Sequence, residues 1–323
     1  MSTLYHPERI VALAFLFAIG VGTALLMLPV AQAEGQAAPR LTALFTAASA
    51  GCVTGLAVVD TGTYWSGFGQ WVLVGLFQVG GFGMMTAATL LGTMVNRSLQ
   101  LRMRLVTQVE SHVIGLGDVT SVAKLVFIVT VAMELLTAAA LATRLHLGYG
   151  LPWNEAAWSG LFHSISAFNN AGFSIHGDSL MRYATDVWML APVMAAIVIG
   201  GLGFPVLHDL RVRWHDPRHW TLHTKLTLMG TAMLLAGGFV ILLWFEWSNA
   251  KTLGALAWPD KMLAAAFSSV SARTAGFNVI DIGALTHESL ALHYLLMFVG
   301  GGSAGTAGGV KVGTFLVLLL LVW

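Results

Sequence analysis

One short pattern occurs three times in this chain and divides it into stretches of similar build. Each copy reads Phe-x-x-x-Ser-Ala, followed by a short polar stretch, a glycine and an apolar residue. The copies lie at 45–56, 162–173 and 267–277, and the third is one residue shorter before its glycine. Because internal repeats indicate repeated supersecondary units, we expect the chain to be built from copies of one structural element.

Long apolar stretches flank every copy of the pattern, one before it and one after it. They lie at 10–30 and 71–91, at 124–142 and 187–207, and at 226–247 and 292–323. A stretch of about 20 apolar residues is long enough to cross a bilayer core of ~30 Å. With 57% hydrophobic and 10% charged residues, the chain has too few charges to cover a water-soluble fold. These features predict an all-α membrane protein with six full spans.

A shorter segment lies between the two spans of each unit, at about 39–51, 152–168 and 259–272. These segments are short for a full span and suit re-entrant half-helices. Each begins with a proline, which the first turn of a helix tolerates. We therefore predict three units, each with a long helix, a short segment, a glycine-containing loop and a second long helix, with bounds 1–98, 99–215 and 216–323.

The charged residues between the spans predict an orientation. The loops after the first and second units carry most of the lysines and arginines, whereas the opposite side is net negative. Basic loops stay in the cytoplasm, so the repeated glycine loops are expected to face outward. The stretch that ends in Ala31-Gln32-Ala33 is similar to a signal peptide with its cleavage site, but it is long for one and is needed as the first helix of the first unit.

The repeated loop has the properties of a cation site. Irregular backbone at membrane depth requires surrounding protein or a water-filled cavity, and its carbonyls can then replace the hydration shell of a monovalent cation. Glycine allows the carbonyls to turn inward, and the negative end of the preceding half-helix favours a cation there. The alternative, that the glycines serve only helix packing, explains three matched loops less well.

Other functional classes receive less support. Cys52 is the only cysteine, the histidines are scattered without a metal-binding motif, and a net charge of +1 gives no nucleic-acid footprint. No site for a bound metal cofactor is expected from these residues. One alternative is an intramembrane serine protease that uses Ser303, which would need a histidine facing it. Its Gly-x-Ser-x-Gly match lacks the strand and helix that this motif requires, and an overlapping Gly-x-Gly-x-x-Gly lacks a βαβ unit. A small-solute channel or secondary transporter would be expected to have inverted repeats.

The pieces 53–56, 166–173 and 271–278 closely resemble the Trk/Ktr/HKT superfamily of potassium transporters, most of all the bacterial Trk and Ktr membrane subunits. The resemblance covers essentially the whole chain. It implies four helix–pore-loop–helix units around one central pore, as in potassium channels, with one filter glycine in each. Three of these units are recognised here, with the second helix of the third incomplete and the fourth unit absent, so the chain is expected to be a fragment. It places the potassium filter at Val53, Thr54, Gly55, Asn170, Ala171, Gly172, Thr274, Ala275 and Gly276. Gly55 fits the potassium-permeable pattern, since sodium-preferring relatives often carry serine there.

The same resemblance assigns an intramembrane gate below the filter, at Gly300, Gly301, Gly302, Ser303, Ala304, Gly305, Thr306, Ala307, Gly308, Gly309 and Lys311. Glycine gives such a segment conformational freedom. The implied function is uptake of K+, with Na+ as a further ion, across the cytoplasmic (inner) membrane, and not enzymatic catalysis. The implied partners are a second copy of the subunit, a cytosolic ring of nucleotide-binding regulatory subunits, and the lipid bilayer.

Four further polar residues require an explanation. Glu134 lies within an apolar stretch, where an ionisable residue is a functional candidate. Helix packing through a hydrogen bond to a neighbouring unit is favoured over an ion or proton path. Arg273 would repel a cation inside the filter, but the family motif carries it, so the resemblance implies that it braces the pore loop from behind. His163 and His176 flank the second loop and are expected to be structural.

Overall fold

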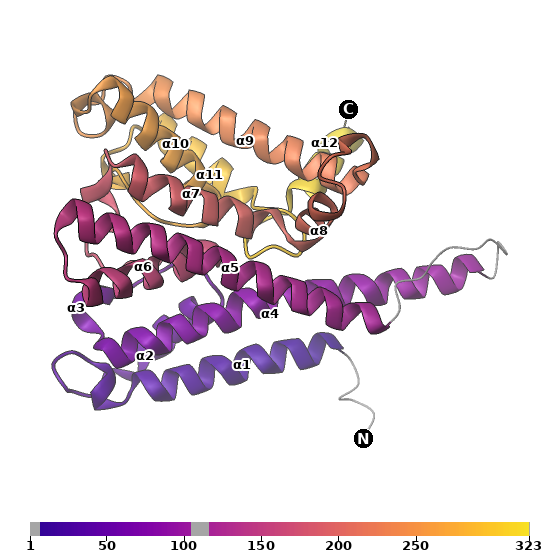
Figure 1. Cartoon of the computed structure of the whole chain (residues 1–323), viewed down its shortest axis with the longest axis horizontal. Coiled ribbons are helices and arrows are strands. Elements are labelled where there is room, and N and C mark those ends of the chain that lie inside the picture. The colour runs from indigo at the N-terminus through magenta and orange to yellow at the C-terminus, as the bar shows by residue number, and fades with distance from the viewer. Residues whose placement is uncertain (1–6, 105–115, 323) are drawn as a thin grey trace.

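A computed structural model describes the backbone of residues 7–104 and 116–322 and the side chains of 9, 11–85 and 124–321. These residues are helical, with two isolated bridges and no strand in the described ranges. The long helices run side by side along the molecule (Figure 1). In chain order the helices are α1 (Pro7–Leu26), α2 (Arg40–Gly51), α3 (Thr61–Tyr64), α4 (Gly67–Arg104), α5 (Leu116–Tyr149), α6 (Trp153–Phe168), α7 (Val187–Leu202), α8 (Phe204–Val212), α9 (Leu222–Glu246), α10 (Trp258–Thr274), α11 (His287–Phe298) and α12 (Val312–Val322).

The three short segments predicted between the spans are helices α2, α6 and α10. Pro39 and Pro152 cap the first two, and Pro259 lies in the first turn of the third. All three helices lie at the same end of the molecule, on the left of Figure 1. A long helix, a short helix and another helix follow one another from α1 to α4, from α5 to α7 and from α9 to α11. The three units with bounds 1–98, 99–215 and 216–323 remain a prediction.

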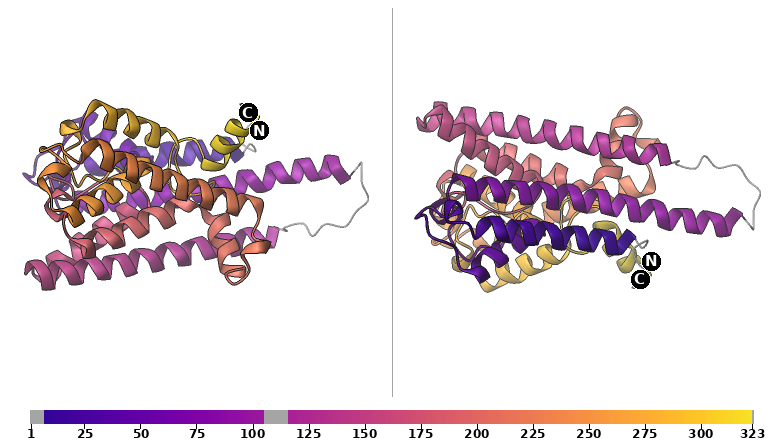
Figure 2. Two further views of the ribbon diagram at one scale, coloured as in Figure 1. Left: turned by 90° about the horizontal axis from the view of Figure 1, so that it is seen from above. Right: turned by 90° about the horizontal axis from the view of Figure 1, so that it is seen from below.

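Each short helix packs against the long helices around it. Helix α2 contacts α1 and α4, α6 contacts α5 and α7, and α10 contacts α9 and α11. Contacts also join the neighbouring groups, since α6 touches α4 and α10 touches α7. Figure 2 shows the same arrangement from two other sides, with one end of α4 extending beyond the rest of the bundle. Each short helix therefore packs between two other helices of the chain.

The span predicted at 187–207 is wrong as a continuous helix. It divides into α7 and α8, whose axes are bent by 98°. Gly203 lies between them with φ 89°, a conformation that L-residues with a side chain rarely adopt. Pro205 follows in the first turn of α8, where its missing N–H costs no hydrogen bond. The apolar run hides this break because glycine is compatible with an apolar pattern.

The stretch predicted at 292–323 is likewise two helices, α11 and α12, joined by non-helical residues 299–311. This break was expected from the glycine content of the run. Within the described residues, three helices are long and apolar enough to cross a membrane, or four if the bent pair is one span. Residues Val11–Leu26 and Val312–Leu321 are shorter apolar helices. The count of six full spans therefore remains a prediction.

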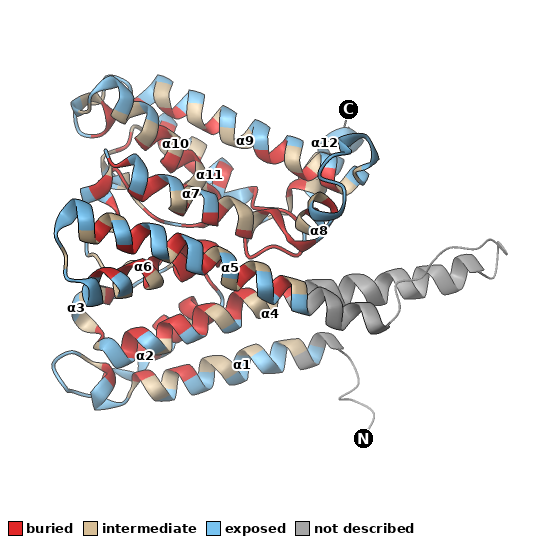
Figure 3. Ribbon diagram, in the orientation of Figure 1, coloured by how far each residue is buried: buried red, intermediate tan, exposed pale blue. Residues whose placement is uncertain are grey.

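Burial separates the inner short helices from the outer surface. Ten of the 16 residues of α6 are buried, whereas outer helices expose large apolar side chains such as Trp244, at 81%, and Leu320, at 71%. Figure 3 shows buried residues concentrated where the helices meet and exposed residues along the outer faces. Water would make such exposed apolar area unfavourable, so a lipid surround is the environment that suits this fold.

Candidate functional site

Each short helix is followed by a loop whose glycine has left-handed backbone. The angle φ is 77° at Gly55, 71° at Gly172 and 79° at Gly276. A residue with a Cβ is disfavoured by about 1–2 kcal/mol in this conformation. The three glycines that the sequence singles out are thus the positions where the chain needs glycine for its backbone.

The structure brings the three glycine loops together although they are about a hundred residues apart in sequence. A Cβ added to Gly55 would lie 2.8 Å from the carbonyl oxygen of Ala171 and 3.4 Å from the Cα of Gly172. A Cβ added to Gly172 would lie 3.4 Å from the Cα of Gly276. The three loops therefore lie side by side, backbone against backbone, with no room for side chains between the glycines.

The serine of each repeat closes its loop in the same way. The backbone N–H of the residue five positions later donates to the serine carbonyl, from Thr54 to Ser49, from Ala171 to Ser166 and from Gly276 to Ser271, over 2.9, 2.7 and 3.2 Å. The side chains of Ser166 and Ser271 also donate to the carbonyls of Phe173 and Phe277, over 2.7 and 2.6 Å. In the first loop, the hydroxyl of Thr54 donates to that of Ser49 over 3.0 Å. The repeated serine thus fastens each loop to its helix.

The length difference in the third repeat has a structural consequence. The residue two positions before the glycine is left-handed in the first two loops, with φ 55° at Val53 and 56° at Asn170. The third loop is one residue shorter, and Ala275, directly before its glycine, has φ −83°. A β-branched residue such as Val53 rarely has positive φ, and this conformation is costly wherever it occurs. The first two loops therefore hold a strained residue that the third does not contain.

The carboxyl ends of α2, α6 and α10 meet these loops. Unpaired carbonyls at a helix C-terminus carry partial negative charge, and all three helices end directly before the glycine loops. Gly276 is exposed and Gly55 and Gly172 are partly exposed, while Ala171 and Ala275 beside them are buried. Chemically, this arrangement offers backbone oxygens and helix ends to a cation, and no charged side chain among the nine predicted filter residues.

A second set of glycines, Gly80, Gly200 and Gly300, follows the three glycine loops in the chain and has a different structural role. A Cβ at Gly80 would clash with the carbonyl of Gly51, and one at Gly200 would clash with that of Phe168. These glycines let α4 and α7 approach the last turns of α2 and α6. Gly300 instead faces the carbonyl of Gly308 in its own run. The packing explanation therefore applies to these glycines, at least in the first two stretches.

The Gly-rich run from Gly300 to Lys311 passes next to the break between α7 and α8. The N–H of Gly302 donates to the carbonyl of Gly201 over 2.8 Å, and that of Phe204 donates to Ala304 over 3.2 Å. Lys311 donates through Nζ to the carbonyl of Ala307 over 2.6 Å. The run and the break thus satisfy each other's backbone groups, as irregular backbone inside a membrane must.

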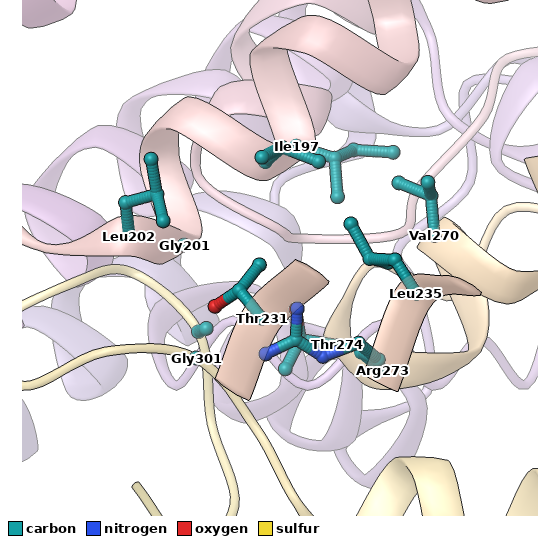
Figure 4. A pocket seen from close by; sticks show the side chains of 11 residues that line it. Ile197, Gly201, Leu202, Thr231, Leu235, Val270, Arg273, Thr274 and Gly301 are labelled. Atoms are coloured by element: carbon teal, nitrogen blue, oxygen red, sulfur yellow. The ribbon is translucent and has the colours of Figure 1, made fainter. Parts of the chain in front are cut away.

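Arg273 contacts the Gly-rich run rather than the filter loop that it was expected to brace. Its guanidinium donates to the carbonyl of Gly300 over 2.5 Å and is 7% exposed. It borders a cavity of about 20 Å³, close to the room that one water molecule needs. Figure 4 shows the guanidinium and the Thr231 side chain facing this cavity. The Nε of Arg273 and the Oγ1 of Thr231 have no hydrogen-bond partner among the described residues.

Glu134 packs between helices, as the sequence predicts. Its carboxylate accepts hydrogen bonds from Gln78 of α4 over 2.5 Å and from Asn169, directly after α6, over 3.0 Å. Gln78 is a contributor that sequence analysis missed, although a lone amide in an apolar span was a signal that could have pointed to it.

The two histidines beside the second loop are structural, as expected. The rings of His163 and His176 stack with centroids 4.9 Å apart. His163 bonds Ser159 through one nitrogen and Ser174 through the other, over 2.8 and 2.9 Å. No group of metal-binding side chains occurs in the part of the chain that the structure describes. Ser303 likewise has no hydrogen bond to a histidine among the described residues, so the geometry that a serine protease needs is not seen there.

Ion pairs fasten the outer loop between α6 and α7. Burial opposes the charge of Asp186, but hydrogen bonds from Arg144 and Tyr149, over 2.7 and 2.9 Å, hold its pKa below the ordinary value. The hydrogen bond from Arg182 lowers the pKa of Asp178. Both carboxylates are therefore charged at neutral pH, in the segment that joins α6 to α7.

Fold and loops together define a helical, multi-pass membrane protein with glycine loops at the ends of short helices. The family model described as TrkH, cation transport protein, matches residues 6–322. The chain belongs to this TrkH family of cation transport proteins.

The names of three relatives agree with the assignment to this family. The chain is 42% identical over 318 residues to the Ktr system potassium uptake protein B of Bacillus subtilis, covering 98% of this chain and 70% of that protein. It is 36% identical to the potassium/sodium uptake protein NtpJ of Enterococcus hirae, covering 97% and 69%. It is 39% identical to the Ktr system potassium uptake protein B of Vibrio alginolyticus, covering 98% and 69%. All three are named as uptake proteins, which does not favour the protease or the small-solute alternative.

A solved structure shares the fold. The potassium transporter TrkH from Vibrio parahaemolyticus matches with a TM-score of 0.67 and 19% identity, over 99% of this chain. The chain spans 62% of the length of that transporter. At this identity the match shows the fold, a TrkH-like helical fold, as the family resemblance implied.

Proposed function

We propose that this chain forms part of the pore of a K+ uptake protein of the cytoplasmic membrane. The observation that carries the proposal is the meeting of Gly55, Gly172 and Gly276, all left-handed, at the carboxyl ends of three short helices. Backbone carbonyls at such a place can replace the hydration shell of a cation. The filter consists of these glycines and of Val53, Thr54, Asn170, Ala171, Thr274 and Ala275. Relatives named for potassium uptake support K+ as the ion, and NtpJ, named for potassium and sodium, keeps Na+ as a second one.

The Gly-rich run serves as the gate of this pore. It is irregular, and it is hydrogen-bonded both to the break at Gly203 and, through the side chains of Asn170 and Arg273, to the filter loops. Glycine gives it many conformations of similar energy. Movement of the run would open or close the path below the filter without unfolding a helix.

The proposal extends to architecture and partners. Three helix–pore-loop–helix units, at 1–98, 99–215 and 216–323, would supply three filter loops and six spans. The basic residues of the segment between α8 and α9 lie at the end of the molecule opposite the short helices, which favours a cytoplasmic position by the positive-inside rule. This side would meet a cytosolic nucleotide-binding ring, and the subunit would pair with a second copy. No enzymatic activity is proposed.

Growth tests this function directly. The full-length gene product is expressed in a bacterial strain without its own K+ uptake systems, on medium with limiting K+. Growth together with saturable K+ uptake is the expected result. Absence of K+ uptake from a strain in which the protein is present in the membrane would overturn the proposal.

A further inference from the structure

The amide side chain of Asn170 joins three segments of the chain. Its Oδ1 accepts a hydrogen bond from the hydroxyl of Thr274 over 2.7 Å, and its Nδ2 donates to the hydroxyl of Thr306 over 2.8 Å. The same Nδ2 lies 3.3 Å from the carbonyl of Ile197 and 3.4 Å from that of Phe168. Asn170 is 2% exposed. One buried side chain therefore connects the second loop, the third loop and the Gly-rich run.

Thr306 is the member of this set that lies outside the filter loops. Its hydroxyl accepts from Asn170 and donates its only proton to the carbonyl of Phe168, the last residue of α6, over 2.9 Å. Its N–H donates to the carbonyl of Gly200 over 3.1 Å. Thr306 is 1% exposed. The Thr306 hydroxyl thus acts both as donor and as acceptor. An aliphatic side chain at this buried position could make neither hydrogen bond.

A second connection joins the same parts of the molecule. Arg273, directly before Thr274, holds the carbonyl of Gly300 at the start of the run. The run is therefore attached to the filter loops at Gly300 and at Thr306. The first loop is held differently, because Thr54 bonds to Ser49 of its own helix.

We propose that Thr306 is a positioning residue that sets the ion preference of the filter from within the Gly-rich run. It fixes the Asn170 amide, which in turn fixes Thr274, so that the Ala171-Gly172 and Ala275-Gly276 peptides keep their spacing. This inference rests on the proposed function. Discrimination between K+ and Na+ depends on the number and geometry of coordinating carbonyls, so loss of the hydroxyl would relax two of the loops and weaken discrimination. Movement of the run would then alter selectivity as well as flow.

The test compares Thr306→Val with Thr306→Ser in the full-length gene product, reconstituted in lipid vesicles. Initial rates of K+ and Na+ uptake are measured separately and their ratio is taken. Valine keeps the shape and removes the hydroxyl, so the K+/Na+ ratio is expected to fall about fivefold, the size of one net hydrogen bond. Serine keeps the hydroxyl and is expected to retain the ratio. Thr143→Val is the matched control, because the Thr143 hydroxyl bonds only its own helix, at the carbonyl of Ala139 on the exposed side of α5.

Thr306→Ala provides a second variant, since it removes the same hydroxyl and leaves every proposed filter residue unchanged. It is expected to lower the K+/Na+ ratio as Thr306→Val does, and it decides the question if Thr306→Val does not fold. An unchanged ratio in the folded variants without the hydroxyl would overturn the inference and assign Thr306 a purely structural role. Wild-type vesicles without K+ uptake would instead contradict the proposed function, so the two failures are distinguishable.

Discussion

The carboxylate of Glu134 accepts a hydrogen bond from the side-chain amide of Asn169 over 3.0 Å, across the interface between α5 and the loop that follows α6. Asn169 directly precedes Asn170, which contacts both the third loop and the Gly-rich run. A second amide, from Gln78 of α4, completes the group. One acidic side chain thus ties together the helix of one stretch and the loop of another, close to the glycine loops.

Glu134→Ala is expected to destabilise the protein by about 2 kcal/mol, because the amides of Gln78 and Asn169 would be left buried without this acceptor. Glu134→Gln, which keeps one acceptor oxygen, should cost less. Thermal unfolding in detergent measures both. Glu288→Ala, at an exposed position in the first turn of α11, serves as control and should stay within ~0.5 kcal/mol of wild type. Equal losses in Glu134→Ala and Glu288→Ala would contradict the role of this carboxylate.

Gly172→Ala is expected to abolish K+ uptake. The added Cβ would meet the carbonyl of Ala275, and φ of 71° adds about 1–2 kcal/mol. Gly150→Ala separates the two effects, because Gly150 also has positive φ, 70°, but open space around its Cβ. Uptake assays and melting temperatures of both variants are compared. If Gly150→Ala reduced uptake as strongly, the close approach of the loops would not be the cause.

The break at Gly203 should be sensitive to any side chain. Alanine there would have φ of 89° and a Cβ in contact with the carbonyl of Ser303. Gly203→Ala is therefore expected to lower the melting temperature. It is also expected to change the rate of K+ uptake, because the added Cβ would displace the Gly-rich run at Ser303. Gly237→Ala, in α9 with open space around its Cβ, should be neutral or slightly stabilising. Unchanged melting and uptake in Gly203→Ala would show that the run does not depend on this break.

Asp186 should make the stability of the outer loop pH-dependent. Its pKa is lower in the folded chain than the ordinary value near 3.9, so its contribution is present above that value and is lost as pH falls through the folded pKa. Asp186→Asn should therefore lower the melting temperature at pH 7 and differ less from wild type below pH 4. The effect should remain under ~3 kcal/mol because Arg144 is 39% exposed. A difference that stays constant from pH 7 to the acid range would argue against the ion pair.

The sequence predicted those parts of the fold that depend on local composition. Helices α2, α6 and α10 begin within one or two residues of the expected positions, because a proline and an apolar run define each start. The need for glycine at Gly55, Gly172 and Gly276 also followed from the repeat. Whether those glycines select an ion is a separate matter that uptake measurements decide.

Long-range contacts account for what sequence reasoning missed. The stretch 187–207 is uniformly apolar, and its break at Gly203 depends on Ala304, which accepts a hydrogen bond from Phe204 a hundred residues earlier. The family motif implied that Arg273 braces the pore loop, but the hydrogen-bond partner of its guanidinium is the carbonyl of Gly300, far along the chain. From the sequence, Thr306 was only one residue of a glycine-rich run. The structure gives it a specific position through hydrogen bonds with Asn170 and Phe168.

The most direct test of the central claim is the K+/Na+ uptake ratio of wild type and of Gly55→Ser in the full-length gene product. A serine at this position adds a side chain where the Cβ alone would lie 2.8 Å from the carbonyl of Ala171. We predict that wild type prefers K+ and that Gly55→Ser largely loses this preference while still reaching the membrane. An unchanged ratio in Gly55→Ser would contradict the assignment of these glycine loops as the ion filter.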